Sequence, residues 1–318
     1  MTRKVDIHEV LCRAGDVPLI DVRSPAEFAA GHIPGANNVA LFDDAERSEI
    51  GTLYKQAGRE EAVTRGLAIA GPKAGSLVGA VRELAADRRA IVHCWRGGMR
   101  SEAFAWMLHQ CEFDIAVLQG GYKSFRRAAH AEFESHRSLV TISGMSGSGK
   151  TQLLHALRDS GEQVLDLEAM ANHRGSAFGG IGLPPQPTVE QFENELFLQW
   201  RNFDPDRPVW VESESQTIGR VYIPNPIFEQ MVHSPAVVLE VDFEKRAEFL
   251  VQVYGGFQSQ EFAASIEKIK KRLGGERYQR AMNAVERNDV LEVARISLEY
   301  YDRGYQRASA KWAHRESM

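Results

Sequence analysis

Strand-like and helix-like patterns alternate along most of this 318-residue chain. Short apolar runs predict strands over residues 18–23, 38–41 and 138–143, and a further run over 236–242 predicts a buried strand. Segments with apolar residues at helical spacing separate these runs, and from Phe243 onward the pattern is helical. The expected fold class is therefore α/β with a helical C-terminus.

Two predicted helices begin with residues that suit a hydrogen-bonded N-cap. Ser24 stands three residues before Glu27, and Thr188 stands three residues before Gln191, so each hydroxyl can accept from a free N–H of the first turn. The helix after Thr188 has an apolar face that we expect to be core, formed by Val189, Phe192, Leu196 and Trp200.

The length of the chain is sufficient for two domains with separate hydrophobic cores. A polar, mostly helical stretch over residues 122–137 is the expected linker, which places the domains at residues 1–132 and 133–318. The net charge is −5, so a nucleic acid would need a local basic patch rather than the field of the whole protein.

The cysteine count and the absence of long apolar runs bear on the compartment. Cys12, Cys94 and Cys111 are too few for a disulfide framework or a zinc quartet, and free thiols suit a reducing cytosol. The first residues lead into no apolar signal core, and no apolar run has the length of a membrane span. We therefore expect a cytoplasmic protein without a membrane partner.

Cys94 follows a short apolar run, Ile91–Val92, and precedes a helical segment. The free N–H groups of a helix N-terminus and nearby arginines lower the pKa of a thiol and favour the reactive thiolate. A buried structural cysteine is the alternative, but glycines and arginines around an inert thiol would serve no purpose. We expect Arg96 and Arg100 to act with the Cys94 thiolate, and Gly97, Gly98 and Ser101 to bind a phosphate group beside it.

The first domain resembles the rhodanese family, in which a cysteine at the position of Cys94 carries sulfur. Five residues separate Cys94 from Arg100, one more than in the usual sulfurtransferase loop, and the stretch also fits the signature of cysteine phosphatases. The loop alone favours phosphatase and chalcogen transferase chemistry equally. The stretches that carry the resemblance are Leu19–Arg23, Glu27–Phe28, Gly31–Ala36 and Leu118–Tyr122.

A second anion-binding motif follows the strand predicted at 138–143. The stretch from Gly144 to Thr151 has the G-x-x-x-x-G-K-T spacing of a P-loop and leads into a helical segment. Its glycines free backbone N–H groups to surround a phosphate, whatever molecule the phosphate belongs to. The expected phosphate-binding residues are Gly144, Ser146, Gly147, Ser148, Gly149, Lys150 and Thr151.

Acidic residues end the next two predicted strands, 163–168 and 208–214. A carboxylate at either strand end suits a magnesium ion beside a P-loop. We expect Thr151 and Asp166 to bind Mg²⁺, with Glu212 as the alternative carboxylate. A polar, glycine-rich segment over 171–180 lies between the two strands and predicts a binding loop. The residues expected to contact substrate are Asn172, His173, Arg174, Ser176, Glu212 and Glu214.

Basic clusters in the linker and in the C-terminal helices are candidate contacts for an RNA backbone, although such clusters also form ordinary solvated faces. An inserted helical stretch ending near Ala86 is either an ordinary amphipathic insertion or a source of ligand contacts. The basic clusters comprise Lys123, Arg126, Arg127, Lys268, Lys270, Lys271 and Arg272, and the polar residues of the insertion are Lys55, Gln56 and Arg59.

The pairing of the two domains resembles the tRNA 2-selenouridine synthase family over nearly the whole chain. The resemblance implies an enzyme that alkylates the sulfur of wobble 2-thiouridine in tRNA with geranyl diphosphate, then replaces the S-geranyl group with selenium from selenophosphate. The matching stretches are Tyr54–Gln56, Cys94–Gly98, Gly120–Lys123, Ala171–Gly179, Glu212–Gly219 and Tyr300–Asp302.

The resemblance also implies roles for the two anion-binding loops. The P-loop would hold the diphosphate, the Cys94 loop would hold selenophosphate, and Cys94 would handle selenium, with a perselenide as one form. Expected partners are tRNA and a selenophosphate-supplying enzyme, while the oligomeric state stays open. Two alternatives remain: a phosphatase-like rhodanese domain fused to an ATP-dependent kinase or NTPase, and an inactive rhodanese domain that serves for docking.

Overall fold

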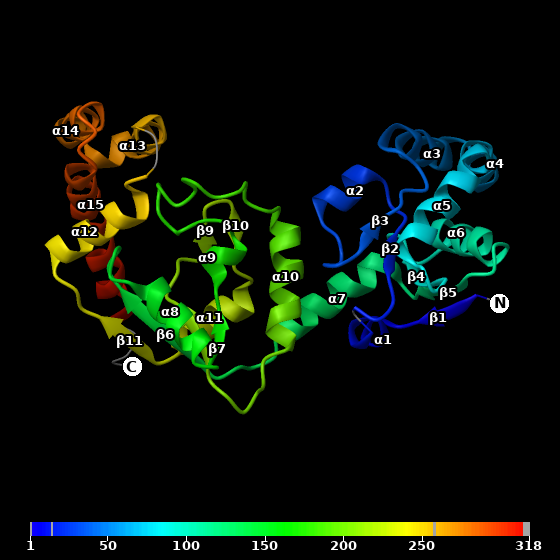
Figure 1. The fold of residues 1–318 in the computed structure, drawn as a ribbon, viewed down its shortest axis with the longest axis horizontal. Helices are drawn as coiled ribbons and strands as arrows, with labels where there is room; N and C mark the ends of the chain where they lie inside the picture. The colour runs from blue at the N-terminus through cyan, green and yellow to red at the C-terminus, as the bar shows by residue number, and fades with distance from the viewer. Residues whose placement is uncertain (1, 14, 257–258, 314–318) are drawn as a thin grey trace. The chain divides into compact units, whose positions relative to one another are not determined.

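The computed structural model describes residues 2–13, 15–256 and 259–313 (Figure 1). The chain forms two compact units, each with its own parallel sheet. The first unit comprises Met1–Glu132 together with Glu193–Phe197, and the second comprises Phe133–Phe192 and Leu198–Met318. The fold class is α/β, as the alternation of patterns predicts.

The first unit is built on a five-stranded parallel sheet of order β1-β5-β4-β2-β3. Ser24 and Glu27 form the predicted capping box at the start of α2. The strands are β1 (Arg3–Val5), β2 (Leu19–Asp21), β3 (Asn37–Asn38), β4 (Arg89–His93) and β5 (Asp114–Leu118). The helices are α1 (Ile7–Cys12), α2 (Pro25–Ala30), α3 (Asp44–Gln56), α4 (Arg59–Ala70), the 3₁₀ turn η1 (Gly71–Lys73), α5 (Ala74–Leu84), α6 (Met99–His109) and α7 (Gly121–Phe133).

One predicted strand of this unit is shorter than its apolar pattern. The run 38–41 predicts a strand, but β3 ends at Asn38. Val39 and Leu41 are buried and their N–H groups donate to carbonyls of Asp21 and Val22, so they pack into the core without continuing the strand. The apolar pattern therefore reflects burial together with continued backbone pairing to the segment after β2.

The second unit has a four-stranded parallel sheet of order β11-β6-β8-β7 and a small antiparallel hairpin, β9–β10. Because the four strands are parallel, the P-loop after β6, Asp166 after β7 and Glu212 at the end of β8 lie at the same edge. The strands are β6 (Leu139–Gly144), β7 (Gln163–Leu165), β8 (Val209–Glu212), β9 (Thr217–Ile218), β10 (Val221–Tyr222) and β11 (Ala236–Leu239).

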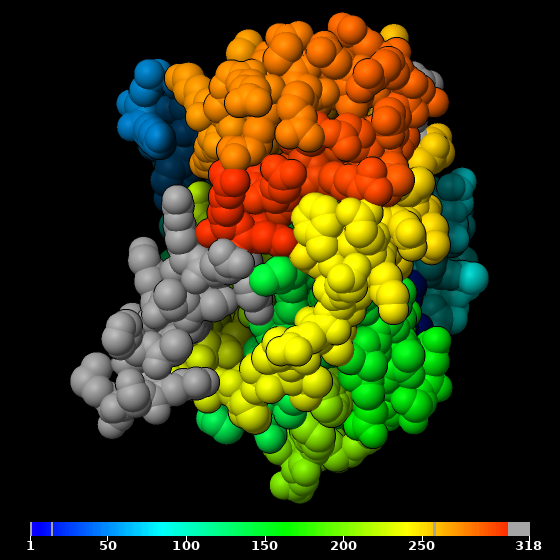
Figure 2. Space-filling view, turned by 90° about the vertical axis from the view of Figure 1, so that its left-hand side faces the viewer, coloured from blue at the N-terminus to red at the C-terminus, as the bar shows by residue number. Residues whose placement is uncertain are grey.

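The helices of the second unit include a C-terminal group that packs together. Figures 1 and 2 show α13 beside α14, and α12 against α15. Phe262, Ile266 and Ile296 lie in the buried core of this group. The helices are α8 (Lys150–Asp159), α9 (Leu167–Met170), α10 (Val189–Arg201), α11 (Asn225–His233), α12 (Phe243–Tyr254), α13 (Ser259–Leu273), α14 (Gly275–Glu286) and α15 (Val290–Ala313).

Three predictions for this unit are wrong in detail. The predicted buried strand β11 is largely exposed, because it is an edge strand that pairs only with β6. Val189, predicted as core, is 37% exposed because it is the first residue of α10, whereas the other three residues of that face are buried. The strand predicted to reach Glu168 ends at Leu165, since Asp166 caps the short helix α9.

No helix within the described residues combines the length and the apolar composition that crossing a bilayer requires.

Candidate functional site

Cys94 lies at the junction of β4 and α6, as predicted. β4 ends at His93, Gly98 is the N-cap residue of α6, and the helix begins at Met99. The Cys94 thiol is buried, and its Sγ lies 3.3 Å from the hydroxyl oxygen of Ser101 in the first turn of α6. The thiol therefore sits at the positive end of the helix dipole.

The loop after Cys94 is held against the turn that follows β5. Gly97 has a φ of 63°, and a Cβ there would lie 2.3 Å from the carbonyl oxygen of Leu118. A Cβ on Gly121 would lie 2.3 Å from the carbonyl oxygen of Cys94, to which Tyr122 donates its N–H at 2.9 Å. Glycine is required on both sides of this contact.

The surroundings of Cys94 favour its thiolate. Burial by itself raises the pKa of the thiol, but the hydrogen bond from Ser101, the charge of Arg100 and the backbone N–H groups of Ser101 and Arg96 outweigh it. The net pKa lies below the ordinary value for cysteine. A cysteine with this electropositive surrounding has the properties of a nucleophile.

The two arginines of this loop differ in their surroundings. Arg100 donates two hydrogen bonds to the carboxylate of Glu27, at 2.6 and 3.3 Å. Burial by itself raises the pKa of Glu27, but the hydrogen bonds and the charge of Arg100 lower it by more. The net pKa of Glu27 is therefore below its ordinary value, and the carboxylate is ionised. Arg100 is therefore held in place by an ion pair, whereas Arg96 is exposed to solvent.

A buried ion pair lies beside the end of β4, the strand that leads into Cys94. Arg23 and Asp21 are fully buried and form an ion pair of 2.6 Å, and the guanidinium of Arg23 lies 4.0 Å from the centre of the Tyr122 ring. His93 is also fully buried, and burial lowers its pKa although Asp21 acts in the opposite direction. His93 is consequently neutral. It packs in the buried end of β4 and adds no positive charge near Cys94.

The P-loop occupies the turn from β6 to α8, in the strand–loop–helix arrangement that was predicted. Gly147 and Gly149 have φ values of 78° and 83°, which side chains rarely adopt. Lys150 donates from Nζ to the carbonyl oxygen of Gly144 at 3.0 Å. The Ser148 hydroxyl is buried and has no hydrogen-bond partner among the described residues. A phosphate group bound in this loop would supply acceptors for both Ser148 and Lys150.

The P-loop lines a cavity of about 480 Å³, within the size range of small-molecule sites. One part of its lining is polar. It comprises the P-loop, Arg174, Ser176 and a group of acidic residues. The other part is apolar and comes from α12, α13 and α15. The cavity therefore offers anion-binding groups and an apolar surface to one ligand.

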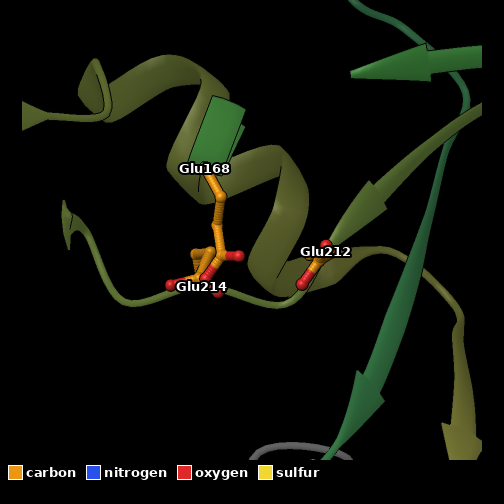
Figure 3. A group of neighbouring side chains, drawn as sticks. All are labelled: Glu168, Glu212 and Glu214. Carbon is orange, nitrogen blue, oxygen red and sulfur yellow. The ribbon is translucent and has the colours of Figure 1, made fainter. Parts of the chain in front are cut away.

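Three glutamates gather beside the P-loop within this cavity. Figure 3 shows Glu168 of α9 pointing toward Glu214, with Glu212 nearby, and one carboxylate oxygen of each lies within 4.8 Å of the others. Burial, followed by the charge of Glu214, raises the pKa of Glu168 to about 9. Burial, followed by the charge of Glu212, raises the pKa of Glu214 to about 7. Such a cluster needs protons or a cation to be stable at neutral pH.

The carboxylates differ in whether they are free to bind a cation. Glu212 bonds the Thr151 hydroxyl, while its buried Oε1 has no hydrogen-bond partner within the described part of the chain. Asp166 uses one oxygen for His155 Nε2 at 2.8 Å and the other to cap Ala169 N at 3.0 Å. Oxygen-only ligands of this kind suit Mg²⁺, and Glu212 is better placed than Asp166 to supply one.

The glycine-rich loop contributes two of its four predicted residues to the cavity lining. Arg174 and Ser176 line the cavity, and Arg174 also donates to the carbonyl oxygen of Ile181 at 2.9 Å. Asn172 instead donates to the carbonyl oxygen of Pro185, and neither Asn172 nor His173 is among the lining residues. The loop thus presents its second half to the cavity.

Two of the basic residues predicted for RNA contact form ion pairs. Arg126 pairs with Glu193 and is part-buried, and Lys270 pairs with Glu267 at 3.0 Å. An RNA contact by either residue would have to compete with its carboxylate. The remaining residues predicted for RNA contact are exposed: Lys123, Arg127, Lys268, Lys271 and Arg272. The polar residues of the insertion, which were expected either to contact a ligand or only to form an ordinary amphipathic face, are also exposed: Lys55, Gln56 and Arg59.

Glu168 and the apolar wall of the cavity are parts of the site that were not among the predicted site residues. The apolar pattern places Glu168 at a strand end, although its spacing from Asp166 also fits the first turn of a helix. The wall residues recur at the same three- and four-residue spacing as core residues, so no signal in a single sequence separates the two.

Comparison with known proteins assigns both halves of the chain. The family described as "tRNA 2-selenouridine synthase AAA domain" matches residues 137–317, and the family described as "Rhodanese-like domain" matches residues 6–128. A tRNA 2-selenouridine synthase of Shewanella denitrificans is 38% identical, over 85% of this chain and 79% of that protein.

Two further relatives with that name extend the match. The protein of Nitrosomonas europaea is 34% identical over 85% of this chain and 80% of its own length. The protein of Marinobacter nauticus is 34% identical over 91% of this chain and 88% of its own length. Both domains and their order are thus covered by single relatives, and the chain belongs to the tRNA 2-selenouridine synthase family.

Proposed function

We propose that this protein converts wobble 2-thiouridine of tRNA to 2-selenouridine in two steps, with geranyl diphosphate and selenophosphate as co-substrates. Membership of the tRNA 2-selenouridine synthase family supports the overall reaction. The observation that carries the choice of the first co-substrate is the cavity of about 480 Å³, in which a P-loop and an uncharged apolar wall face one ligand. Geranyl diphosphate has a matching charged end and apolar chain.

In the first step, the second unit binds geranyl diphosphate and transfers the geranyl group to sulfur. The P-loop amides, Ser148 and Lys150 bind the diphosphate, with Lys150 exchanging its bond to Gly144 for a phosphate oxygen. The thiocarbonyl sulfur attacks C1 of the geranyl group, the C1–O bond breaks, and the N3 proton of the base leaves. Fixed positive charge at the leaving diphosphate lowers the barrier to this transfer.

A magnesium ion fits beside the diphosphate in this proposal. Thr151, Glu168, Glu212 and Glu214 would hold it, because their oxygens are close together and Oε1 of Glu212 lacks a partner among the described residues. When bound, the ion supplies further positive charge to the leaving group. Asp166 serves instead to fix α9 and His155, since both of its oxygens are engaged.

In the second step, selenium replaces the S-geranyl group. Selenium in selenophosphate is already fully reduced, so a perselenide on Cys94 would need an oxidant that neither co-substrate supplies. We therefore place the attack of the Cys94 thiolate at phosphorus: the S–P bond forms and the P–Se bond breaks. The selenide released adds to C2 of the base, geranylthiol leaves, and water frees phosphate from Cys94. The lowered pKa of Cys94 and the loop amides suit this step.

Mass spectrometry of tRNA nucleosides tests both assignments. With both co-substrates present, Cys94→Ala is expected to accumulate S-geranyl-2-thiouridine and form no 2-selenouridine, whereas the control Cys12→Ala, at an exposed cysteine, forms both. Full selenation by Cys94→Ala would contradict the role of this thiol.

The same assay separates the P-loop from the Cys94 loop. Lys150→Ala is expected to form no S-geranyl-2-thiouridine, because the diphosphate loses its positive partner, while the control Lys245→Ala, at an exposed position of α12, keeps wild-type product levels. Unchanged geranylation by Lys150→Ala would contradict the assignment of the diphosphate to the P-loop.

A further inference from the structure

The apolar wall of the P-loop cavity belongs to the C-terminal helices of the second unit. No charged side chain of α12, α13 or α15 is among the residues that line the cavity within the described part of the chain. The wall includes Phe249 and Val253 of α12, Phe262 of α13, and Val290, Val293 and Ala294 of α15.

The few polar atoms on this wall already have partners. The hydroxyl oxygen of Tyr301 accepts from Ala177 N at 2.7 Å, and the Ser297 hydroxyl donates to the carbonyl oxygen of Val293 at 2.7 Å. Tyr254 is hydrogen-bonded to Ser176. The wall consequently presents carbon rather than free hydrogen-bonding groups, so it suits a hydrocarbon better than a nucleoside.

An ion pair between a buried arginine and a partly buried aspartate fixes this wall to the P-loop. Arg246 of α12 donates to the carbonyl oxygen of Ser146 at 3.1 Å and to both carboxylate oxygens of Asp302 in α15, at 2.8 and 2.7 Å. Leu250, one turn along α12, lies 3.3 Å from where a Cβ on Gly147 would stand. The apolar surface therefore begins directly beside the phosphate-binding backbone.

The wall continues from this ion pair along both helices. Val253 lies seven residues beyond Arg246, or about 10 Å at the helical rise of 1.5 Å per residue. Val290, the first residue of α15, lies twelve residues before Asp302, or about 18 Å. Both valines are only partly buried, so they line the cavity without being part of the tightly packed core.

We propose that Val253 and Val290 set the length of the isoprenoid chain that the enzyme accepts; this inference rests on the proposed function and names the specificity determinants of that site. The diphosphate is held at a fixed point by the P-loop, so the distance to the far end of the wall limits the chain. An apolar pocket distinguishes chains that differ by one methylene by about 10- to 200-fold, and one isoprene unit is a larger difference.

The test compares dimethylallyl, geranyl and farnesyl diphosphates as donors to 2-thiouridine tRNA, by kcat/KM and by equilibrium binding. Val290→Phe and Val253→Phe each reduce the space along the apolar wall of the cavity. Two variants are used so that a folding defect in one of them leaves the other as a test. The same substitution at Val237, which is 40% exposed on β11 and does not line the cavity, is the matched control.

We expect Val253→Phe and Val290→Phe each to lower kcat/KM for geranyl diphosphate at least tenfold relative to dimethylallyl diphosphate, while Val237→Phe keeps the wild-type ratio. If folded variants transfer geranyl and dimethylallyl groups in the wild-type ratio, the two valines do not set chain length and this inference alone is overturned. If the wild-type chain binds none of the three diphosphates, the proposed function is overturned together with it.

Discussion

Replacing Glu214 with glutamine is expected to stabilise the metal-free protein, and to do so more at pH 8 than at pH 5.5. Glu214 lies beside Glu168 and Glu212, so ionising all three carboxylates brings like charges together in a partly buried site. Glutamine keeps the size and the hydrogen-bonding capacity of the protonated side chain but carries no charge. The substitution therefore removes repulsion without opening a cavity.

The magnitude follows from the pKa of Glu214, which burial and then the charge of Glu212 raise from 4.5 to about 7. A carboxyl whose pKa is raised by folding costs nothing below pH 4.5, and it destabilises the native state progressively as the pH rises to about 7. The full difference corresponds to about 3 kcal/mol. Because part of this largely buried side chain still contacts solvent, screening reduces the expected gain to about 2 kcal/mol at pH 8 and about 1 kcal/mol at pH 5.5.

Urea unfolding of the full chain in the presence of a chelator measures this gain at both pH values. Glu248→Gln, at an exposed position of α12, is the matched control and is expected to change stability equally little at both. Adding Mg²⁺ at pH 8 is expected to stabilise the wild type more than Glu214→Gln. The ion offsets the repulsion among the carboxylates of the wild type, and the variant has one carboxylate fewer to bind it. A gain that does not grow with pH, or a destabilised variant, would refute the reasoning.

Three further predictions concern other parts of the molecule. Ser101→Ala removes a hydrogen bond that lowers the pKa of Cys94, so the midpoint for reaction with iodoacetamide should move to higher pH; an unchanged pH profile would contradict this. Arg246→Ala leaves the carboxylate of Asp302 without its partner and should cost about 3–5 kcal/mol in urea unfolding, whereas a loss below about 1 kcal/mol would show that the pair matters little. Replacing the exposed residues 271–272 by alanine should reduce the slope of log affinity for tRNA against log salt by about 1 to 2; an unchanged slope would exclude this surface.

Much of the chemistry could be predicted because its signals are local. The glycines of the P-loop, the cysteine between a strand and a helix, and the Ser24–Glu27 capping box each depend on residues a few positions apart. The backbone geometry of such a stretch depends on its own residues, so it can be predicted from the sequence. The order of the two domains followed from the same two motifs.

The remainder depends on contacts between distant segments. Glu168 and Glu214 meet because α9 and the chain after β8 reach the same sheet edge, and their spacing in sequence does not reveal it. The valines of β11 are exposed because the strand has one neighbour, which an apolar run does not show. Likewise, Val253 and Val290 follow the spacing of core residues, and only the packing of α12 and α15 turns them toward a cavity.

We propose that the P-loop cavity binds an isoprenoid diphosphate rather than a nucleotide. Isothermal titration of the full chain with geranyl diphosphate and with ATP, each in the presence of Mg²⁺ and each in competition with the other, tests it most directly. Geranyl diphosphate is expected to bind, ATP is expected not to displace it, and Lys150→Ala is expected to lose the binding. Binding of ATP as tight as that of geranyl diphosphate would exclude this proposal.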